Sequence, residues 1–105
     1  MAYERMGVIG NIGSIEKKGT PEKPFIKMSV AVDKTTTAGK ETIWYQVILT
    51  SPAALQRSDE LMRLYSKGKR VLVEGDLRLR PYVDRNSQEL SVERTIFPYT
   101  RPQLI

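Results

Sequence analysis

"KGKRVLVEGDLRLRPYVDRNSQEL", residues 67–90, is the stretch of sequence that decides the fold. Apolar residues recur at every second position, which is the period of a β-strand with one buried face. These apolar positions are Val71, Val73, Leu77 and Leu79. We therefore predict a strand over residues 70–81 whose four apolar side chains fill a core. Its other face carries the row Arg78, Arg80 and Tyr82, and a strand with guanidinium groups ending in an aromatic ring needs an explanation.

Four further strands and one helix are predicted around this stretch. The strand patterns cover residues 4–19, 24–33, 43–50 and 90–97, and residues 51–68 carry an apolar stripe at helical spacing. The glycines of the first strand, Gly7, Gly10 and Gly13, indicate that it bends around a small barrel. Residues 34–42 are polar and are expected to form a protruding loop.

Three strands, a helix and two strands is the order of the oligonucleotide/oligosaccharide-binding (OB) fold. We therefore predict an all-β protein with one helix: a five-stranded Greek-key OB-fold barrel with the helix between strands 3 and 4. Residues 1–98 are assigned to this single domain, and residues 99–105 to an extended C-terminal tail.

The composition argues against several classes of function. The 105 residues include no Cys and no His, which removes thiolate chemistry, the commonest general base and the commonest metal ligand. We expect no enzyme, no catalytic residue, no metal and no cofactor. The net charge of +5 favours an anionic partner, most commonly nucleic acid. A membrane partner is not expected, because no apolar run approaches the ~20 residues that span a bilayer.

A second row of exposed groups is predicted beside the first. By strand alternation, Trp44 and Lys27 point outwards, and Lys34 and Lys40 lie in the neighbouring loop. Flat rings among flexible cations suit single-stranded nucleic acid, because bases stack on the rings while Lys and Arg attract the phosphates. Arg85, in the turn after Tyr82, is the expected contact of a flap over the bound strand.

Four segments then carry a family resemblance. They are "GVIGNIGSIE", "FIKMSVAVD", "TIWYQVIL" and "LMRLYSKGKRVLVEGDLRLRPYVD", at residues 7–16, 25–33, 42–49 and 61–84. In order and residues they resemble the bacterial and mitochondrial single-stranded DNA-binding protein family over nearly the whole chain. The resemblance implies a sequence-tolerant protein that coats exposed single-stranded DNA in replication, recombination or repair. It leaves the compartment open between the cytoplasm or nucleoid of a bacterium, a plasmid or phage origin, and the mitochondrial matrix.

The resemblance also assigns roles to individual residues. Trp44 and Tyr82 match two of the family's four stacking positions, and Lys27, Arg78 and Arg80 match basic positions along the DNA path. The other two stacking positions hold Thr36 and Thr50, which implies weaker binding or a shifted path. The family typically forms homotetramers, and the residues assigned to the subunit interface are Tyr45, Met6 and Val8. Recruitment of partners through an acidic C-terminal tip is not expected, because the sequence stops at "RPQLI".

Three other readings remain open on the sequence alone. The first alternative is an RNA-binding or scaffolding OB-fold protein of a mitochondrial RNA-editing type of complex. The second is an interaction protein in which Trp44 is buried between subunits. The third is an enzyme that holds Mg²⁺ on Glu74 and Asp76, although such a pair is more often a solvated patch. In a plain solvated face, Arg78 and Arg80 would pair across strands with Glu89 or Glu93.

Overall fold

The computed structural model describes residues 6–105, and the side chains of residues 7–52 and 55–105. Along the chain, the elements are β1 (Met6–Gly19), β2 (Pro24–Thr36), β3 (Gly39–Leu49), α1 (Pro52–Gln56), α2 (Ser58–Leu64), β4 (Arg70–Val83), β5 (Leu90–Pro98) and β6 (Gln103–Leu104). Neither described helix is long and apolar enough to cross a membrane.

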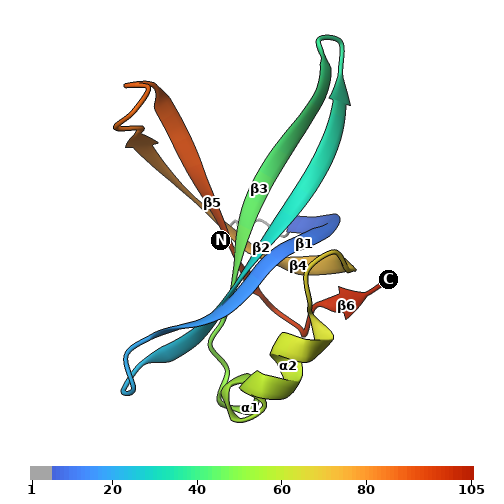
Figure 1. Ribbon diagram of the computed structural model, residues 1–105, viewed down its shortest axis with the longest axis vertical. Helices are drawn as coiled ribbons and strands as arrows, with labels where there is room; N and C mark the ends of the chain where they lie inside the picture. Colours follow the sequence, from blue (N-terminus) through green and yellow to red (C-terminus); the bar gives the residue numbers. More distant parts are fainter. Residues whose placement is uncertain (1–5) are drawn as a thin grey trace, which may run out of the picture.

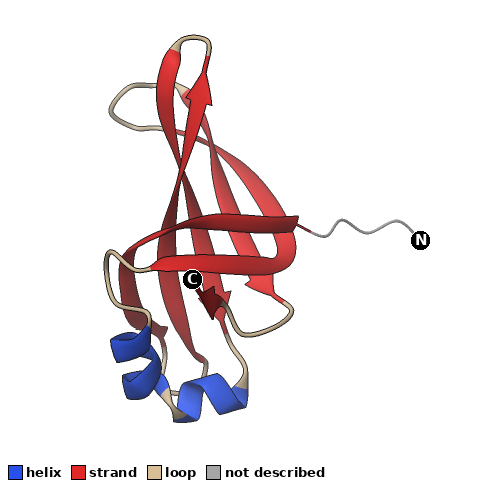
Figure 2. Ribbon diagram, turned by 90° about the vertical axis from the view of Figure 1, so that its right-hand side faces the viewer, coloured by secondary structure: helices blue, strands red, loops and turns tan. Residues whose placement is uncertain are grey.

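One continuous sheet closes into a barrel (Figures 1 and 2). The strand order is β1-β2-β3-β5-β4-β6, and an additional β1–β4 pairing joins the two sides. β1 serves both neighbours: residues 6–11 pair with β4 and residues 11–19 pair with β2, with a register shift between Ile12 and Ser14. The prediction of a bent first strand in a five-stranded OB-fold barrel is confirmed.

The barrel encloses a core that β4 only partly supplies. Val71 and Val73 are fully buried, and they pack with apolar residues of every other long strand and of α2. Leu77 is half-buried against this core, but Leu79 is 59% exposed, so its predicted place in the core is wrong. The reason is that β4 extends beyond the barrel: among the described residues, the part of β4 after Leu77 pairs only with β5, and no described strand lies opposite this two-stranded arm.

The prediction of a protruding loop over residues 34–42 is also wrong. β2 continues to Thr36 and β3 begins at Gly39, so the two strands form a long hairpin with a two-residue turn. The Thr36 hydroxyl donates to the carbonyl oxygen of Gly39 at 3.0 Å, and the Thr42 hydroxyl donates to the Asp33 carboxylate at 2.8 Å. Threonine favours strands, and these side-chain bonds hold together a segment whose polarity had indicated a loop.

The predicted helix 51–68 is divided into two short helices that close one end of the barrel (Figure 2). Arg57 separates α1 from α2, with a non-helical ψ of 29°. Tyr65 follows α2 and is buried, and its hydroxyl donates to the carbonyl oxygen of Pro102 at 2.6 Å. The tail is therefore docked: beyond Pro102, β6 pairs with Val71 and Leu72 of β4.

We expect Gly75 to be indispensable for closing the barrel. At this residue, β4 changes partner from β1 to β5, and an added Cβ would lie 2.4 Å from the carbonyl oxygen of Phe97. Moving the backbone of β5 to make room for a methyl group would strain the sheet. Gly75→Ala should therefore lower the free energy of unfolding by about 1–3 kcal/mol in urea denaturation.

The matched control is Gly7→Ala on β1. There an added Cβ would meet the flexible Glu74 side chain at 3.4 Å and the carbonyl oxygen of Val73 at 4.0 Å, which are ordinary contacts, so the change should leave stability within about 0.5 kcal/mol or raise it slightly. Equal stability of the two variants would contradict the role given to Gly75.

Candidate nucleic-acid interface

Trp44 presents its indole on the outer face of the barrel. Its neighbours along β3, Tyr45 and Val47, are buried, whereas Trp44 is 53% exposed. A Cβ placed on Gly13 would lie 2.6 Å from Cζ3 of Trp44, so the ring reaches over β2 onto the bare backbone of β1. Gly13 lies at the register shift of β1, and its lack of a side chain leaves room for the indole. The ring is thus supported from below and open to solvent above.

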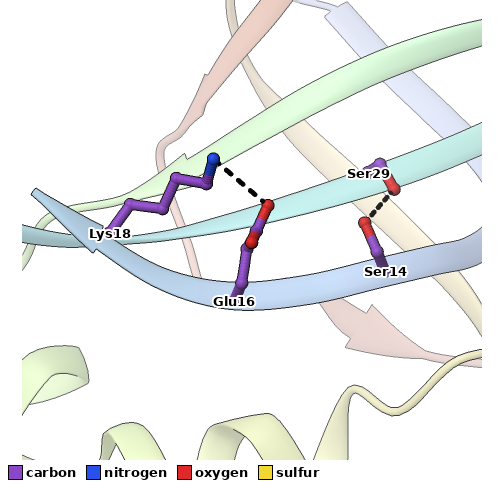
Figure 3. A network of polar contacts seen from close by, with 4 residues as sticks. All are labelled: Ser14, Glu16, Lys18 and Ser29. Carbon is purple, nitrogen blue, oxygen red and sulfur yellow. Dashed lines mark hydrogen bonds and ion pairs between the residues drawn. The ribbon is translucent and has the colours of Figure 1, made fainter.

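A pair of serines fixes the sheet beside this ring (Figure 3). Ser14 and Ser29 face each other across β1 and β2, and their hydroxyl oxygens are 2.6 Å apart. Farther along β1, Glu16 forms an ion pair with Lys18 at 3.5 Å. Lys27 stands opposite Glu16 in the register and shares the outer face with Ser29. Lys27 therefore lies on the same face of the barrel as the indole, as predicted.

The basic row of β4 lies on the same face. Arg78 is opposite Thr95 of β5, and Thr95 is in turn opposite Gln46 of β3, two residues from Trp44. Arg78 is therefore two strand spacings, about 10 Å, from Gln46 on β3. The Arg78 guanidinium stands 4.7 Å from the centre of the Phe97 ring and 3.6 Å from the Asp76 carboxylate.

Arg80 makes the cross-strand pair that a solvated face would have. Its guanidinium donates to the Glu93 carboxylate at 2.8 Å. Both arginine side chains remain largely exposed, and exposed ion pairs are worth only about 0–1 kcal/mol, so a phosphate can displace these carboxylates at little cost. Tyr82 follows in the row, 44% exposed and opposite Ser91.

Two hairpins carry the remaining predicted cations (Figure 1). The β2–β3 hairpin and the β4–β5 hairpin leave the barrel towards the same side and diverge. Lys40 is on the Trp44 face of the first hairpin. Lys34 is opposite Glu41 in the strand register, and both positions belong to the other face of the hairpin. Arg85 is exposed at the tip of the second, where the Asp84 side chain accepts a bond from the Asn86 N–H at 2.8 Å.

Two of the three residues assigned to a subunit interface lie in the core of their own chain. Tyr45 and Val8 are only 5% and 7% exposed and belong to the core of their own chain, so little of either is left for a partner. Their burial follows from the strand alternation, which puts Tyr45 on the face of Val47. The Met6 side chain lies outside the described residues.

Sequence reasoning missed an apolar surface on the β4–β5 hairpin. On the face opposite to Arg80 and Tyr82, this hairpin exposes a group of residues that we call the apolar strip: Leu79, Val83, Leu90 and Val92. The signal was present in the sequence, because the alternation continues past the point where the barrel ends.

Comparisons with known proteins agree with this architecture. Residues 3–97 match the model of the single-strand binding protein family. A single-stranded DNA-binding protein of Rickettsia conorii is 30% identical to this chain over 106 aligned positions. The match covers 93% of this chain and 68% of that protein.

Solved structures share the fold. A small single-stranded DNA-binding protein from Streptomyces coelicolor has a TM-score of 0.70 at 16% identity, with 100% of this chain and 96% of that chain covered. A Plasmodium falciparum SSB, solved in complex with ssDNA, has a TM-score of 0.66 at 19% identity, with 100% and 95% covered. The mitochondrial single-stranded DNA-binding protein Rim1 of S. cerevisiae has a TM-score of 0.66 at 22% identity, with 100% and 97% covered.

The support of the indole by Gly13 can be tested directly. Gly13→Ala should lift the ring from β1, because the added methyl occupies the position of the indole edge. Trp44 is the only tryptophan, so its fluorescence reports the change without background. We expect acrylamide to quench the variant more strongly than the wild-type protein. Gly7→Ala on the same strand is the control, and unchanged quenching in Gly13→Ala would show that the ring does not rest there.

Proposed function

The chain belongs to the single-strand binding protein family, and from this premise we propose that it binds single-stranded DNA without strong sequence preference. It coats strands that become exposed during replication, recombination or repair. The protein acts by binding, without catalysis. The bound strand crosses the outer face of the barrel and continues along the β4–β5 hairpin.

The observation that carries this proposal is the half-exposed indole of Trp44 on the backbone of Gly13. A ring of this size that is held flat and open offers a base a partner of matching shape. Stacking on such a ring contributes about 1–3 kcal/mol for any base, which accounts for binding without sequence preference. Tyr82 provides a second ring on the β4–β5 hairpin.

The cations around the two rings hold the phosphates. Lys27, Arg78 and Arg80 share the face of Trp44, and Lys40 and Arg85 lie on the two hairpins. Lys34 is a weaker candidate for a phosphate contact, because it lies on the opposite face of its hairpin. The family match and the Rickettsia relative favour DNA over the RNA-editing alternative, and no feature of the described residues favours that alternative.

We further propose that the protein assembles into a homo-oligomer, a tetramer by family resemblance, through the apolar strip. Leu90 is 76% exposed and Leu79 59%, on a two-stranded arm that cannot bury them itself. An isolated hairpin is marginally stable in water, and exposed apolar patches commonly mark interaction sites. A second copy of the chain would cover the strip and leave Tyr82, on the opposite face, accessible to DNA.

Titration of Trp44 fluorescence tests the binding function. Oligo-dT should quench the emission, and duplex DNA should have little effect because its bases are already stacked. The affinity should fall with salt, with a log–log slope of about −0.7 for each phosphate contact. Tyr82→Ala should weaken binding by about 1–3 kcal/mol, whereas Tyr82→Phe keeps the ring and should keep the affinity.

Absence of quenching at every salt concentration would overturn the proposed function. An unchanged affinity of Tyr82→Ala would remove that ring from the binding site and leave Trp44 as the stacking residue.

The apolar strip is tested by sedimentation velocity. The wild-type protein should sediment as an oligomer, and Leu90→Lys should shift it towards the monomer because a buried ammonium group is costly. Ser91→Lys places the same charge one position along, on the opposite face, and should leave the assembly unchanged. A monomeric wild-type protein would contradict this role of the strip, as would an oligomer that Leu90→Lys does not disturb.

A further inference from the structure

A cavity of about 380 Å³ opens where β3 ends, between the helices and the chain that follows β5. Its walls combine apolar residues, two aromatic rings and two cations. They include Ile48, Leu49, Leu61, Phe97, Tyr99, Arg57 and Arg101. The volume is within the range of small-molecule sites, which are mostly apolar with a few polar groups that orient the ligand.

The cavity continues the face that carries Trp44. Ile48 has the same strand parity as Trp44 and lies four residues along β3, a distance of about 13 Å. Phe97 follows Thr95 on the outer face of β5, and the Arg78 guanidinium stands over its ring at 4.7 Å. Lys27 is opposite Ile48 on β2. A strand that stacks on Trp44 and passes between Lys27 and Arg78 therefore reaches this opening.

Two guanidinium groups are available at the opening. Arg57 separates the two helices, and its largely exposed side chain contacts Glu60 only at 3.9 Å. Arg101 donates from Nε to the Tyr65 hydroxyl at 3.2 Å, and this bond uses one of the five donors of the group. Tyr65 is itself buried and bonded to Pro102, so Arg101 is anchored to a rigid part of the fold. Guanidinium groups match phosphate oxygens in geometry.

We propose that this cavity is a nucleotide subsite. A base of the bound strand packs against Phe97 and Ile48, and Arg57 and Arg101 bind a backbone phosphate of the same strand. The subsite rests on the proposed binding of single-stranded DNA and extends its path beyond the sheet. It places an aromatic contact next to Thr50, which also lines the cavity and carries no ring.

Oligonucleotide length separates this subsite from the rest of the path. We would titrate Trp44 fluorescence with a thymidine dinucleotide as the short oligomer and with oligo-dT of about 16 nucleotides, the upper end of the range of site sizes for one barrel, as the long one. The dinucleotide is too short to stack on Trp44 and also span the distance of about 13 Å to Ile48, whereas the long oligomer reaches the cavity. With the long oligomer, Arg57→Ala should make the log–log salt slope less steep by about 0.7, the loss of one phosphate contact. With the short oligomer, the slope should equal that of the wild-type protein.

Two controls separate this effect from a change in charge. Arg63→Ala removes one exposed cation from α2 outside the cavity and should change neither slope. Glu60→Gln removes the carboxylate beside Arg57 and should maintain or raise the affinity for the long oligomer.

The possible failures are distinguishable. If the wild-type protein is quenched but Arg57→Ala retains its slope with the long oligomer, the subsite is overturned and the binding function stands. The same conclusion follows if Arg57→Ala and Arg63→Ala lower the slope equally. If the wild-type protein is quenched by neither oligomer, both proposals are overturned.

Discussion

The rest of the structure depends on the pairing of β1 with β4, which closes the sheet. β4 is 14 residues long, and its first half is held by β1 whereas its second half is held by β5. The exchange occurs at Gly75, where the backbones approach too closely for a side chain. Because closure uses only the first half of β4, the second half is free to leave the barrel as one strand of a hairpin. That hairpin carries Arg80 and Tyr82 on one face and the apolar strip on the other.

This constraint also explains which parts of the sequence could be interpreted in advance. Alternation of apolar residues placed every long strand and the faces of Trp44, Arg78 and Tyr82, because a strand in a sheet has a fixed period of two. Alternation says which residues share a face, but not where the opposite wall of a barrel ends, so Leu79 was assigned to the core although it lies beyond the wall. The same limit hid the apolar strip.

Other features depend on interactions that a linear pattern does not contain. The hairpin at residues 34–42 is held by threonine hydroxyls across its two strands, and a polar composition alone does not distinguish such strands from a loop. The docking of the tail on Tyr65 involves Arg101 and Pro102, which are 36 and 37 positions away in the chain. The cavity requires β3, the helices and the chain beyond β5 together, so its residues carried no signal in sequence order.

The two threonines at positions where the family resemblance implies aromatic rings, Thr36 and Thr50, shift the balance of binding energy. Two rings, Trp44 and Tyr82, contribute together about 2–6 kcal/mol if each stacks on one base. A micromolar complex needs about 8 kcal/mol, so a single barrel with two rings requires its phosphate contacts to bind at useful concentrations. Those contacts weaken with salt, whereas stacking depends on it far less. Joining barrels through the apolar strip would compensate without any new ring, because a strand held by one barrel meets the next at a high effective concentration. If the DNA follows the proposed path, the side of the β4–β5 hairpin that faces away from it can therefore decide how tightly the DNA is held.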